Sequence, residues 1–197
     1  METADKVAAI LMASGFSKRF GGRNKLLLPF RGKPLAAYTL ELASAFDFHG
    51  GIYFITSSGE TAALAEHLPK VRAIKNAAAE KGLRESIRLG VAAADADTAY
   101  YLFFPCDMPF LDKGTVQRIL DERRQGYFVE PRYQGRPGNP CLFSARFREE
   151  LLSLAEGETP RLIKARYPEA LRVVDVSNPL ILEDIDDGET LKRFENS

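Results

Sequence analysis

Glycines and cationic side chains are concentrated in one loop near the start of the chain, Leu11–Lys25. The loop follows Lys6–Met12, a short apolar run typical of a buried strand. Glycines let the backbone approach a ligand closely, successive N–H groups form an anion-binding concavity, and lysine and arginine neutralise charge. The anion that best suits such a loop is a nucleoside triphosphate. A mobile polar loop is the alternative interpretation.

Two familiar phosphate-binding motifs do not fit this loop. A Walker A loop requires Gly-x-x-x-x-Gly-Lys-Ser/Thr, but Gly15 and Gly21 are too far apart and Asn24 precedes the lysine. A dinucleotide fingerprint requires Gly-x-Gly-x-x-Gly, and Gly15, Gly21 and Gly22 lack that spacing.

A second position with chemical potential is Asp107, which directly follows the apolar run Tyr100–Pro105. A carboxylate fixed at the end of a strand suits Mg²⁺, which takes few protein carboxylates and otherwise binds water and phosphate oxygens. The alternative is a turn residue that caps the following helix, a role for which Asp112 is better placed.

Apolar runs typical of strands alternate along the chain with patterns typical of amphipathic helices. We expect strands at Lys6–Met12, Gly51–Thr56, Val71–Lys75, Tyr100–Pro105 and Leu171–Val176, with Tyr127–Tyr133 and Pro140–Phe143 as a small hairpin-like β insertion. We expect helices at Leu35–Phe46, Thr61–Leu68, Leu83–Ala94, Lys113–Arg123, Ala145–Leu154, Pro160–Tyr167 and Glu189–Phe194. This order predicts an α/β fold with a doubly wound, mostly parallel sheet. Ligands of such sheets bind at the carboxyl ends of the strands. The Leu11–Lys25 loop and the segment that carries Asp107 are both expected to lie at that edge.

The composition is that of a single domain spanning residues 1–197. A formal net charge of zero argues against general nucleic-acid binding. No apolar stretch approaches the roughly 20 residues that span a membrane, and the N-terminus lacks the features of a secretory signal. The two cysteines, Cys106 and Cys141, make neither a disulfide framework nor a zinc site. We therefore expect a cytoplasmic protein.

The loop resembles the signature Leu-x-Ala-Ala/Gly-Gly-x-Ser-x-Arg-x-Gly-x-x-Lys of a nucleotidyltransferase family with a Rossmann-like fold. Its positions are occupied by Leu11, Ala13, Gly15, Ser17, Arg19, Gly21 and Lys25, with one extra residue before the lysine. Within that family the chain is most similar to the molybdenum cofactor cytidylyltransferases, which share Asn-Lys-Leu-Leu and Gly-Lys-Pro-Leu. The guanylyl-transferring relatives differ at Ala13-Ser14 and at Asn24, so the resemblance implies CTP as the nucleotide.

The resemblance also implies site residues. It assigns catalytic roles to Arg19, Lys25 and Asp107, and Mg²⁺ binding to Asp107 and Asp186. The nucleotide-binding residues that it implies are Leu11, Ala13, Ser14, Gly15, Arg19, Lys25, Gly82 and Ser86. On sequence alone, Ser86 is more simply an ordinary helical serine.

The second metal ligand is open between two residues. Asp186 stands at the family position, but Asp184 precedes it by two, and residues two apart in an extended segment share a side. The alternative is an acidic N-cap for the tail helix, which Asp187 and Gly188 would also suit.

The implied reaction joins CMP from CTP to the terminal phosphate of the molybdenum–molybdopterin cofactor and releases pyrophosphate, with an apo molybdenum hydroxylase as a further partner. Candidates for the acceptor's phosphate are Arg84, Arg88, Arg132, Arg136 and Arg161, and Asn139 replaces a family histidine on that side. The alternatives are cytidylyl or uridylyl transfer to a sugar or polyol phosphate, and a non-catalytic chaperone of the cofactor.

Overall fold

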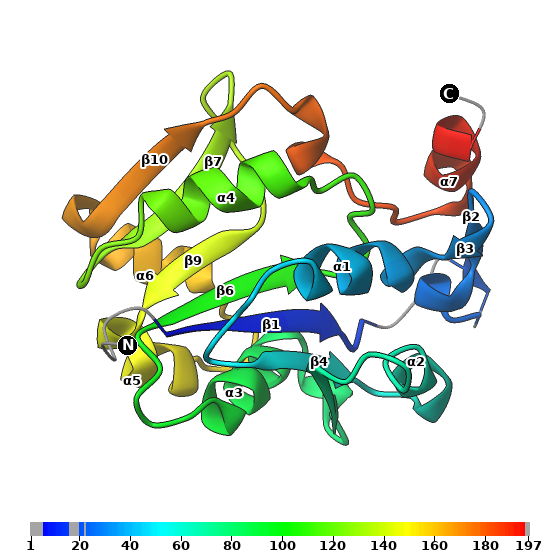
Figure 1. Ribbon diagram of the computed structural model, residues 1–197, viewed down its shortest axis with the longest axis horizontal. Helices are drawn as coiled ribbons and strands as arrows, with labels where there is room; N and C mark the ends of the chain where they lie inside the picture. The colour runs from blue at the N-terminus through cyan, green and yellow to red at the C-terminus, as the bar shows by residue number, and fades with distance from the viewer. Residues whose placement is uncertain (1–5, 16–19, 22, 196–197) are drawn as a thin grey trace.

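A central sheet organises the computed structural model, which describes residues 6–15, 20–21 and 23–195 (Figure 1). It has eight strands in the order β10-β7-β9-β6-β1-β4-β5, with β8 paired to β7. They are β1 (Val7–Ala13), β4 (Ile52–Thr56), β5 (Val71–Lys75), β6 (Tyr100–Pro105), β7 (Phe128–Tyr133), β8 (Arg136–Pro137), β9 (Cys141–Ser144) and β10 (Leu171–Asp175). A separate two-stranded sheet pairs β2 (Pro29–Phe30) with β3 (Lys33–Pro34).

The strand order reverses beside β1. From β1 the chain builds β4 and then β5 on one side, returning to form β6 on the other, and all these neighbours are parallel. β9 lies antiparallel between β6 and β7, and β10 is parallel to β7. The carboxyl ends of β1 and β6 therefore flank the point of reversal, where α/β sheets bind their ligands.

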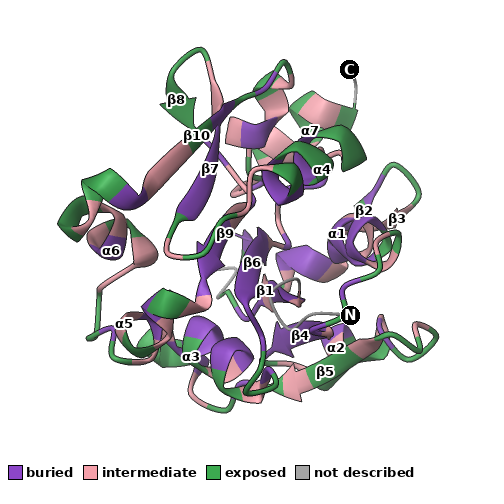
Figure 2. Ribbon diagram, turned by 60° about the vertical axis from the view of Figure 1, so that its left-hand side comes forward, coloured by how far each residue is buried: buried purple, intermediate pink, exposed green. Residues whose placement is uncertain are grey.

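Helices cover both faces of this sheet (Figures 1 and 2). They are α1 (Leu35–Ser44), α2 (Gly59–Ala63), α3 (Leu83–Ala93), α4 (Lys113–Asp121), α5 (Arg148–Leu152), α6 (Pro160–Arg166) and α7 (Gly188–Glu195). Short 3-10 turns include η3 (Lys25–Leu27), η4 (Ala79–Lys81), η5 (Ala145–Phe147), η6 (Pro168–Ala170) and η7 (Pro179–Leu182). One buried cluster joins alternate β1 residues to α1 and α4, and the other joins the remaining β1 residues to α3, α5 and α6.

The predicted fold, α/β with a mostly parallel doubly wound sheet, is confirmed. The segments expected as a small hairpin-like insertion, Tyr127–Tyr133 and Pro140–Phe143, form β7 and β9, which pair antiparallel but lie within the central sheet, so the expectation of a separate small insertion is wrong. The hairpin in this region is instead β7 with β8, joined by a tight turn in which Gln134 and Gly135 both have positive φ. The structure adds that β7 and β9 also belong to the central sheet, because β9 pairs with β6 as well as with β7.

Helix ends differ from the prediction where a local cap decides them. The helix expected at Thr61–Leu68 begins at Gly59, because the Ser58 hydroxyl accepts a hydrogen bond from the Thr61 amide at 3.1 Å. Within the part of the chain that the structure describes, no helix is both long and apolar enough to cross a membrane.

Gly90 allows α3 to lie close against the central strand. A Cβ at this position would meet Cγ2 of the buried Ile10 side chain on β1 at 2.4 Å, well inside van der Waals contact. The close approach also sets the position of Ser86, a predicted site residue that lies on the same helix.

We expect Gly90→Ala to lower the free energy of unfolding by about 1–2 kcal/mol. Overpacking a core costs roughly 1–3 kcal/mol, and a 2.4 Å contact with a branched side chain belongs to the upper part of that range, so a net loss remains after the ~1 kcal/mol that alanine gains over glycine in a helix. Urea denaturation checks this, with Gly59→Ala as the matched control, since no atom lies within 4 Å of a Cβ there. A Gly90→Ala protein as stable as the wild type would contradict the close approach of α3 to β1.

Candidate active site

Two segments far apart in the sequence meet at the carboxyl edge of the sheet. Asp107 follows β6, and its carbonyl accepts a 2.9 Å hydrogen bond from the amide of Ile185. The Ile185 side chain is fully buried in the core, so the extended backbone turns its neighbours Asp184 and Asp186 toward the opposite side.

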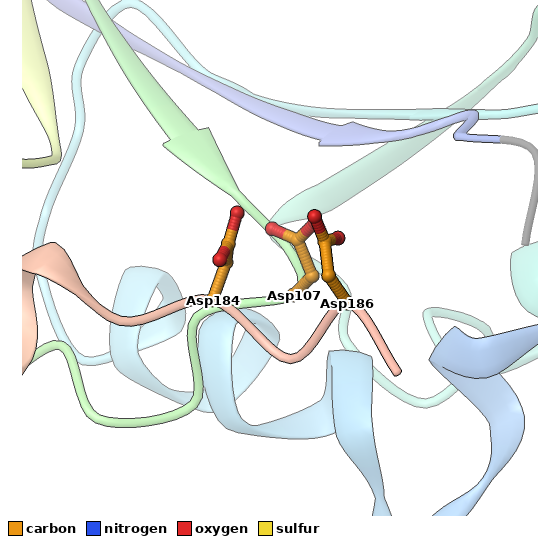
Figure 3. Close-up of side chains that lie close together, drawn as sticks. All are labelled: Asp107, Asp184 and Asp186. Carbon is orange, nitrogen blue, oxygen red and sulfur yellow. The ribbon is translucent and has the colours of Figure 1, made fainter. Parts of the chain in front are cut away.

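This arrangement brings three carboxylates together (Figure 3). One oxygen from each of Asp107, Asp184 and Asp186 lies within 4.8 Å of the others. The sequence left the second acid open between Asp184 and Asp186, and the structure places both beside Asp107. Carboxylate oxygens in such a group are the ligands that Mg²⁺ and Mn²⁺ prefer.

Lys25 reaches into this group of acids. Its ammonium nitrogen lies 2.9 Å from Oδ2 of Asp107 and 2.6 Å from Oδ1 of Asp186. Burial alone would lower the pKa of Lys25, but the charges of Asp107 and Asp186 outweigh it and hold that pKa above its usual value. Lys25 therefore remains a cation at the centre of the site.

Asn24 fixes the position of this lysine. Its side-chain oxygen accepts a hydrogen bond from the Leu26 amide at 3.1 Å and so starts the 3-10 turn η3. Its amide nitrogen donates to the Thr61 hydroxyl at 2.8 Å, which ties the turn to α2. The resemblance in sequence made Asn24 an indicator of nucleotide choice. In the structure its side chain hydrogen-bonds with Leu26 and Thr61.

The acidic cluster carries unbalanced negative charge. Desolvation and the nearby charges of Asp186 and Asp107 raise the pKa of Asp184 above the usual value for an aspartate. Like charges this close repel one another, and a cation shared among them relieves the repulsion.

Other aspartates make the helix caps that were the alternative interpretation. Asp112 accepts a hydrogen bond from the Thr115 amide at 2.8 Å and caps α4, as predicted, which leaves Asp107 available. Asp187 accepts one from the Thr190 amide at 2.7 Å at the start of α7. Asn178 donates to Asp112 at 2.6 Å and to the Phe110 carbonyl at 3.1 Å, which anchors the segment that leads to Asp184.

A cavity of about 600 Å³ opens beside the cluster. Its walls include the predicted residues Ser14, Gly15, Lys25, Gly82, Ser86 and Asp107, together with Asp184. The Ser14 hydroxyl donates to the Ile55 carbonyl at 3.1 Å, which fixes the end of β1 to β4.

Leu11 and Ala13 lie on the other side of the sheet. Both are buried in the cluster that contains α1, because side chains alternate along β1 and only Met12 and Ser14 turn toward the cavity. Their side chains are core residues, so any contact of this segment with a nucleotide would fall to the main chain. Arg19, predicted to be catalytic, lies outside the described residues.

Ser86 and Gly82 line the part of the cavity formed by α3. The Ser86 hydroxyl accepts a 3.2 Å hydrogen bond from the Asn76 side chain, and both residues are buried. The Gly82 amide donates to the Ala79 carbonyl at 3.0 Å. Ser86 therefore presents a hydroxyl with a fixed oxygen, whereas the Gly82 N–H is committed to its own turn.

The remaining wall of the cavity comes from β7, β9 and α6. It contains Glu130, a strand residue whose side chain is 5% exposed and which pairs with Arg132 at 3.1 Å and with Lys164. Arg161 and Lys164 both line the cavity from α6, and Cys141 lines it from β9. Burial raises the pKa of the Cys141 thiol, which keeps it protonated.

The five arginines that the sequence proposed for the acceptor lie in different surroundings. Arg161 lines the cavity, whereas Arg84 donates to the Leu154 carbonyl, Arg88 pairs with Glu85, Arg132 pairs with Glu130 and Arg136 is exposed on β8. Sequence reasoning missed Glu130 and Lys164. The sequence did offer a signal for each residue. Glu130 is an acid inside an apolar strand, and Lys164 is a cation one helical turn after Arg161.

Comparison with known proteins identifies the family of this chain. Residues 9–171 match the family model of the MobA-like NTP transferase domain. The chain is 27% identical over 196 residues to nicotine blue oxidoreductase of Paenarthrobacter nicotinovorans, which covers 95% of this chain and 96% of that protein. It is 29% identical over 120 residues to molybdenum cofactor guanylyltransferase of Cupriavidus metallidurans (60% and 56% of the two chains). It is 35% identical over 125 residues to 2-C-methyl-D-erythritol 4-phosphate cytidylyltransferase of Geotalea uraniireducens (59% and 53%).

A similar fold occurs in Rv0371c of Mycobacterium tuberculosis. The TM-score is 0.81 at 23% identity, covering 98% of this chain and 99% of that one, and a complex of the same protein with manganese gives 0.75 at 22% identity. The family match spans most of the chain and includes Ser14, Lys25 and Asp107. The chain therefore belongs to the MobA-like NTP transferase domain family, a family of nucleotidyltransferases.

Proposed function

We propose that this protein transfers a cytidylyl group from CTP to the terminal phosphate of the molybdenum–molybdopterin cofactor, with Mg²⁺, releasing pyrophosphate. The observation that carries the proposal is the convergence of Lys25 with Asp107, Asp184 and Asp186 at the mouth of the 600 Å³ cavity. A cation and a carboxylate cluster beside one cavity suit a triphosphate and its divalent ion.

The carboxylates fit a divalent ion. An octahedral Mg²⁺ binds oxygens at about 2.0–2.1 Å, which spaces its ligands roughly 2.9–4.2 Å apart. The oxygens of Asp107, Asp184 and Asp186 lie within 4.8 Å of one another, so a small contraction or an intervening water would suffice. The manganese complex of Rv0371c, a protein of the same fold, supports the same assignment. An ion held by Asp107, Asp184 and Asp186 would supply positive charge that stabilises the leaving pyrophosphate.

The chain's own groups then align two anions that repel each other. Lys25 supplies a cation for the triphosphate, and Ser14 and Gly15 place the end of β1 next to it. The attacking group is a phosphate oxygen that is already ionised, so no general base is required. The protein contributes mainly position and electrostatic stabilisation.

The base would lie against α3. Because the Ser86 oxygen already accepts from Asn76, the hydroxyl hydrogen is directed elsewhere, and cytosine offers ring acceptors for it.

We expect Ser86→Ala to weaken CTP binding roughly threefold to tenfold, the value of one neutral hydrogen bond. Isothermal titration checks this, with the exposed Ser153→Ala as control. Unchanged CTP affinity would remove Ser86 from the base site.

The acceptor would occupy the wall formed by β7, β9 and α6. Arg161 supplies positive charge there, Lys164 shares its charge with Glu130 on the same wall, and Asn139, whose amide nitrogen lies 3.5 Å from the Met108 sulfur, supplies a neutral donor. This charge balance suits a phosphate monoester.

The deciding experiment is pyrophosphate release from each of the four nucleoside triphosphates, with and without molybdenum cofactor. We expect release from CTP that depends on the cofactor. Preference for GTP would overturn the cytidylyl assignment. Release from CTP with 2-C-methyl-D-erythritol 4-phosphate in place of the cofactor would favour the sugar or polyol phosphate alternative, toward which one relative points.

A redox activity is the second candidate, since the relative that aligns with nearly the whole chain is named an oxidoreductase. A transferase needs the carboxylate cluster, whereas electron transfer to a small molecule does not. Oxidation of NADH or NADPH that survives Asp107→Asn, with no pyrophosphate release from any triphosphate, would favour this candidate.

A further inference from the structure

The ammonium of Lys25 lies where a divalent ion would bind. It contacts Asp107 at 2.9 Å and Asp186 at 2.6 Å, using carboxylates of the same cluster that would ligate the ion. The Lys25 side chain is only 10% exposed, whereas those of Asp107 and Asp186 are 25% and 45% exposed, so the ammonium is the shielded member of each pair.

An ammonium and a divalent ion that bind the same carboxylate oxygens weaken each other's binding. A divalent ion draws carboxylate oxygens to about 2.0–2.1 Å, and an ammonium held by the same oxygens would lie beside a double positive charge. We propose that the ammonium of Lys25 competes with the divalent ion for Asp107 and Asp186. When the ion binds, it displaces the ammonium from these carboxylates toward the triphosphate. The role of the triphosphate rests on the proposed function, whereas the competition concerns the metal alone.

The geometry gives the displaced side chain a destination. Lys25 lines the same cavity as Ser14 and Gly15, the residues at the end of β1. A lysine has a flexible four-carbon stem, so its ammonium can leave the acids while the 3-10 turn η3 stays fixed by Asn24. In the cavity it would meet the phosphates of a bound nucleotide.

The consequence is that metal and triphosphate strengthen each other's binding. Without an anion in the cavity, the metal must displace Lys25 from its ion pairs with Asp107 and Asp186. With a triphosphate present, the lysine exchanges carboxylate for phosphate and the metal gains phosphate oxygens. By thermodynamic linkage the same factor raises nucleotide affinity when metal is present.

The test is Mn²⁺ binding without nucleotide, measured from the electron paramagnetic resonance signal of the free ion. We expect Lys25→Met to bind Mn²⁺ about 10- to 100-fold more tightly than the wild type, within the usual range of coupling between sites. Lys25→Arg keeps the charge and is expected to stay near the wild type. Lys33→Met, which removes the ammonium paired with Glu41 on the surface, is the matched control and is expected to change nothing.

The outcomes separate this proposal from the proposed function. If Lys25→Met, or Lys25→Gln where the methionine variant does not fold, binds Mn²⁺ no more tightly than the wild type, the competition is wrong. If Asp107→Asn binds Mn²⁺ as the wild type does, the metal site itself is wrong and the proposal falls with it. Tighter Mn²⁺ binding by Lys25→Met in a protein that uses no CTP would uphold the competition and reject the cytidylyl function.

Discussion

Asp107→Asn is expected to lower the rate of nucleotidyl transfer by about 10³-fold or more and to leave the fold intact. A metal ion supplies several kcal/mol of charge stabilisation in the transition state, and each 1.4 kcal/mol is a factor of ten in rate. The asparagine removes the charge that the ion needs but keeps the size of the side chain. The carbonyl of residue 107 still accepts from Ile185, so the two segments stay together.

Steady-state pyrophosphate release and urea denaturation measure the two halves of this prediction. Asp97→Asn is the control, because Asp97 pairs with Lys6 on the surface and lies outside the cavity. Asp107→Asn with more than a tenth of wild-type turnover would exclude Asp107 as a principal metal ligand, and the same measurement on Asp184→Asn and Asp186→Asn ranks the other two acids.

Lys25→Ala is expected to lower turnover by roughly 10²-fold or more. Preorganised charges aimed at the leaving group typically carry such factors, because they act where charge develops in the transition state. The loss is expected mainly in kcat, since the nucleotide keeps its base and metal contacts. The fold should persist, because Asp107 and Asp186 remain partly exposed, at 25% and 45% of their side chains, and water can solvate them.

Single-turnover kinetics with CTP separate binding from chemistry in this variant. Lys33→Ala serves as the control, since it removes a surface lysine from the same part of the chain. If Lys25→Ala showed near-normal turnover with weakened CTP binding, Lys25 would act in ground-state binding and not in catalysis.

Local sequence patterns predicted most of the strands, a mostly parallel sheet and the two loops at its carboxyl edge, but not the order of the strands. The strands β1 and β6 are continuous apolar runs buried on both faces, a pattern that local residues carry without help from distant ones. The same holds for Asp107, which follows β6 after one residue, and for Asp112, whose cap of α4 depends on the amide of Thr115, three residues away. Local periodicity and capping chemistry therefore predicted these features.

Contacts between distant segments, which no local pattern predicts, set which residues share the site. Asp184 and Asp186 both reach Asp107 because the buried Ile185 between them hydrogen-bonds to the Asp107 carbonyl, a contact across 78 positions that no local pattern reveals. The side chains of Leu11 and Ala13 belong to the core because β1 turns alternate residues to opposite faces of a sheet covered on both sides. Glu130 and Lys164 became candidates for the acceptor wall only when β7 and α6 came together, because burial and charge pairing are properties of the packed chain.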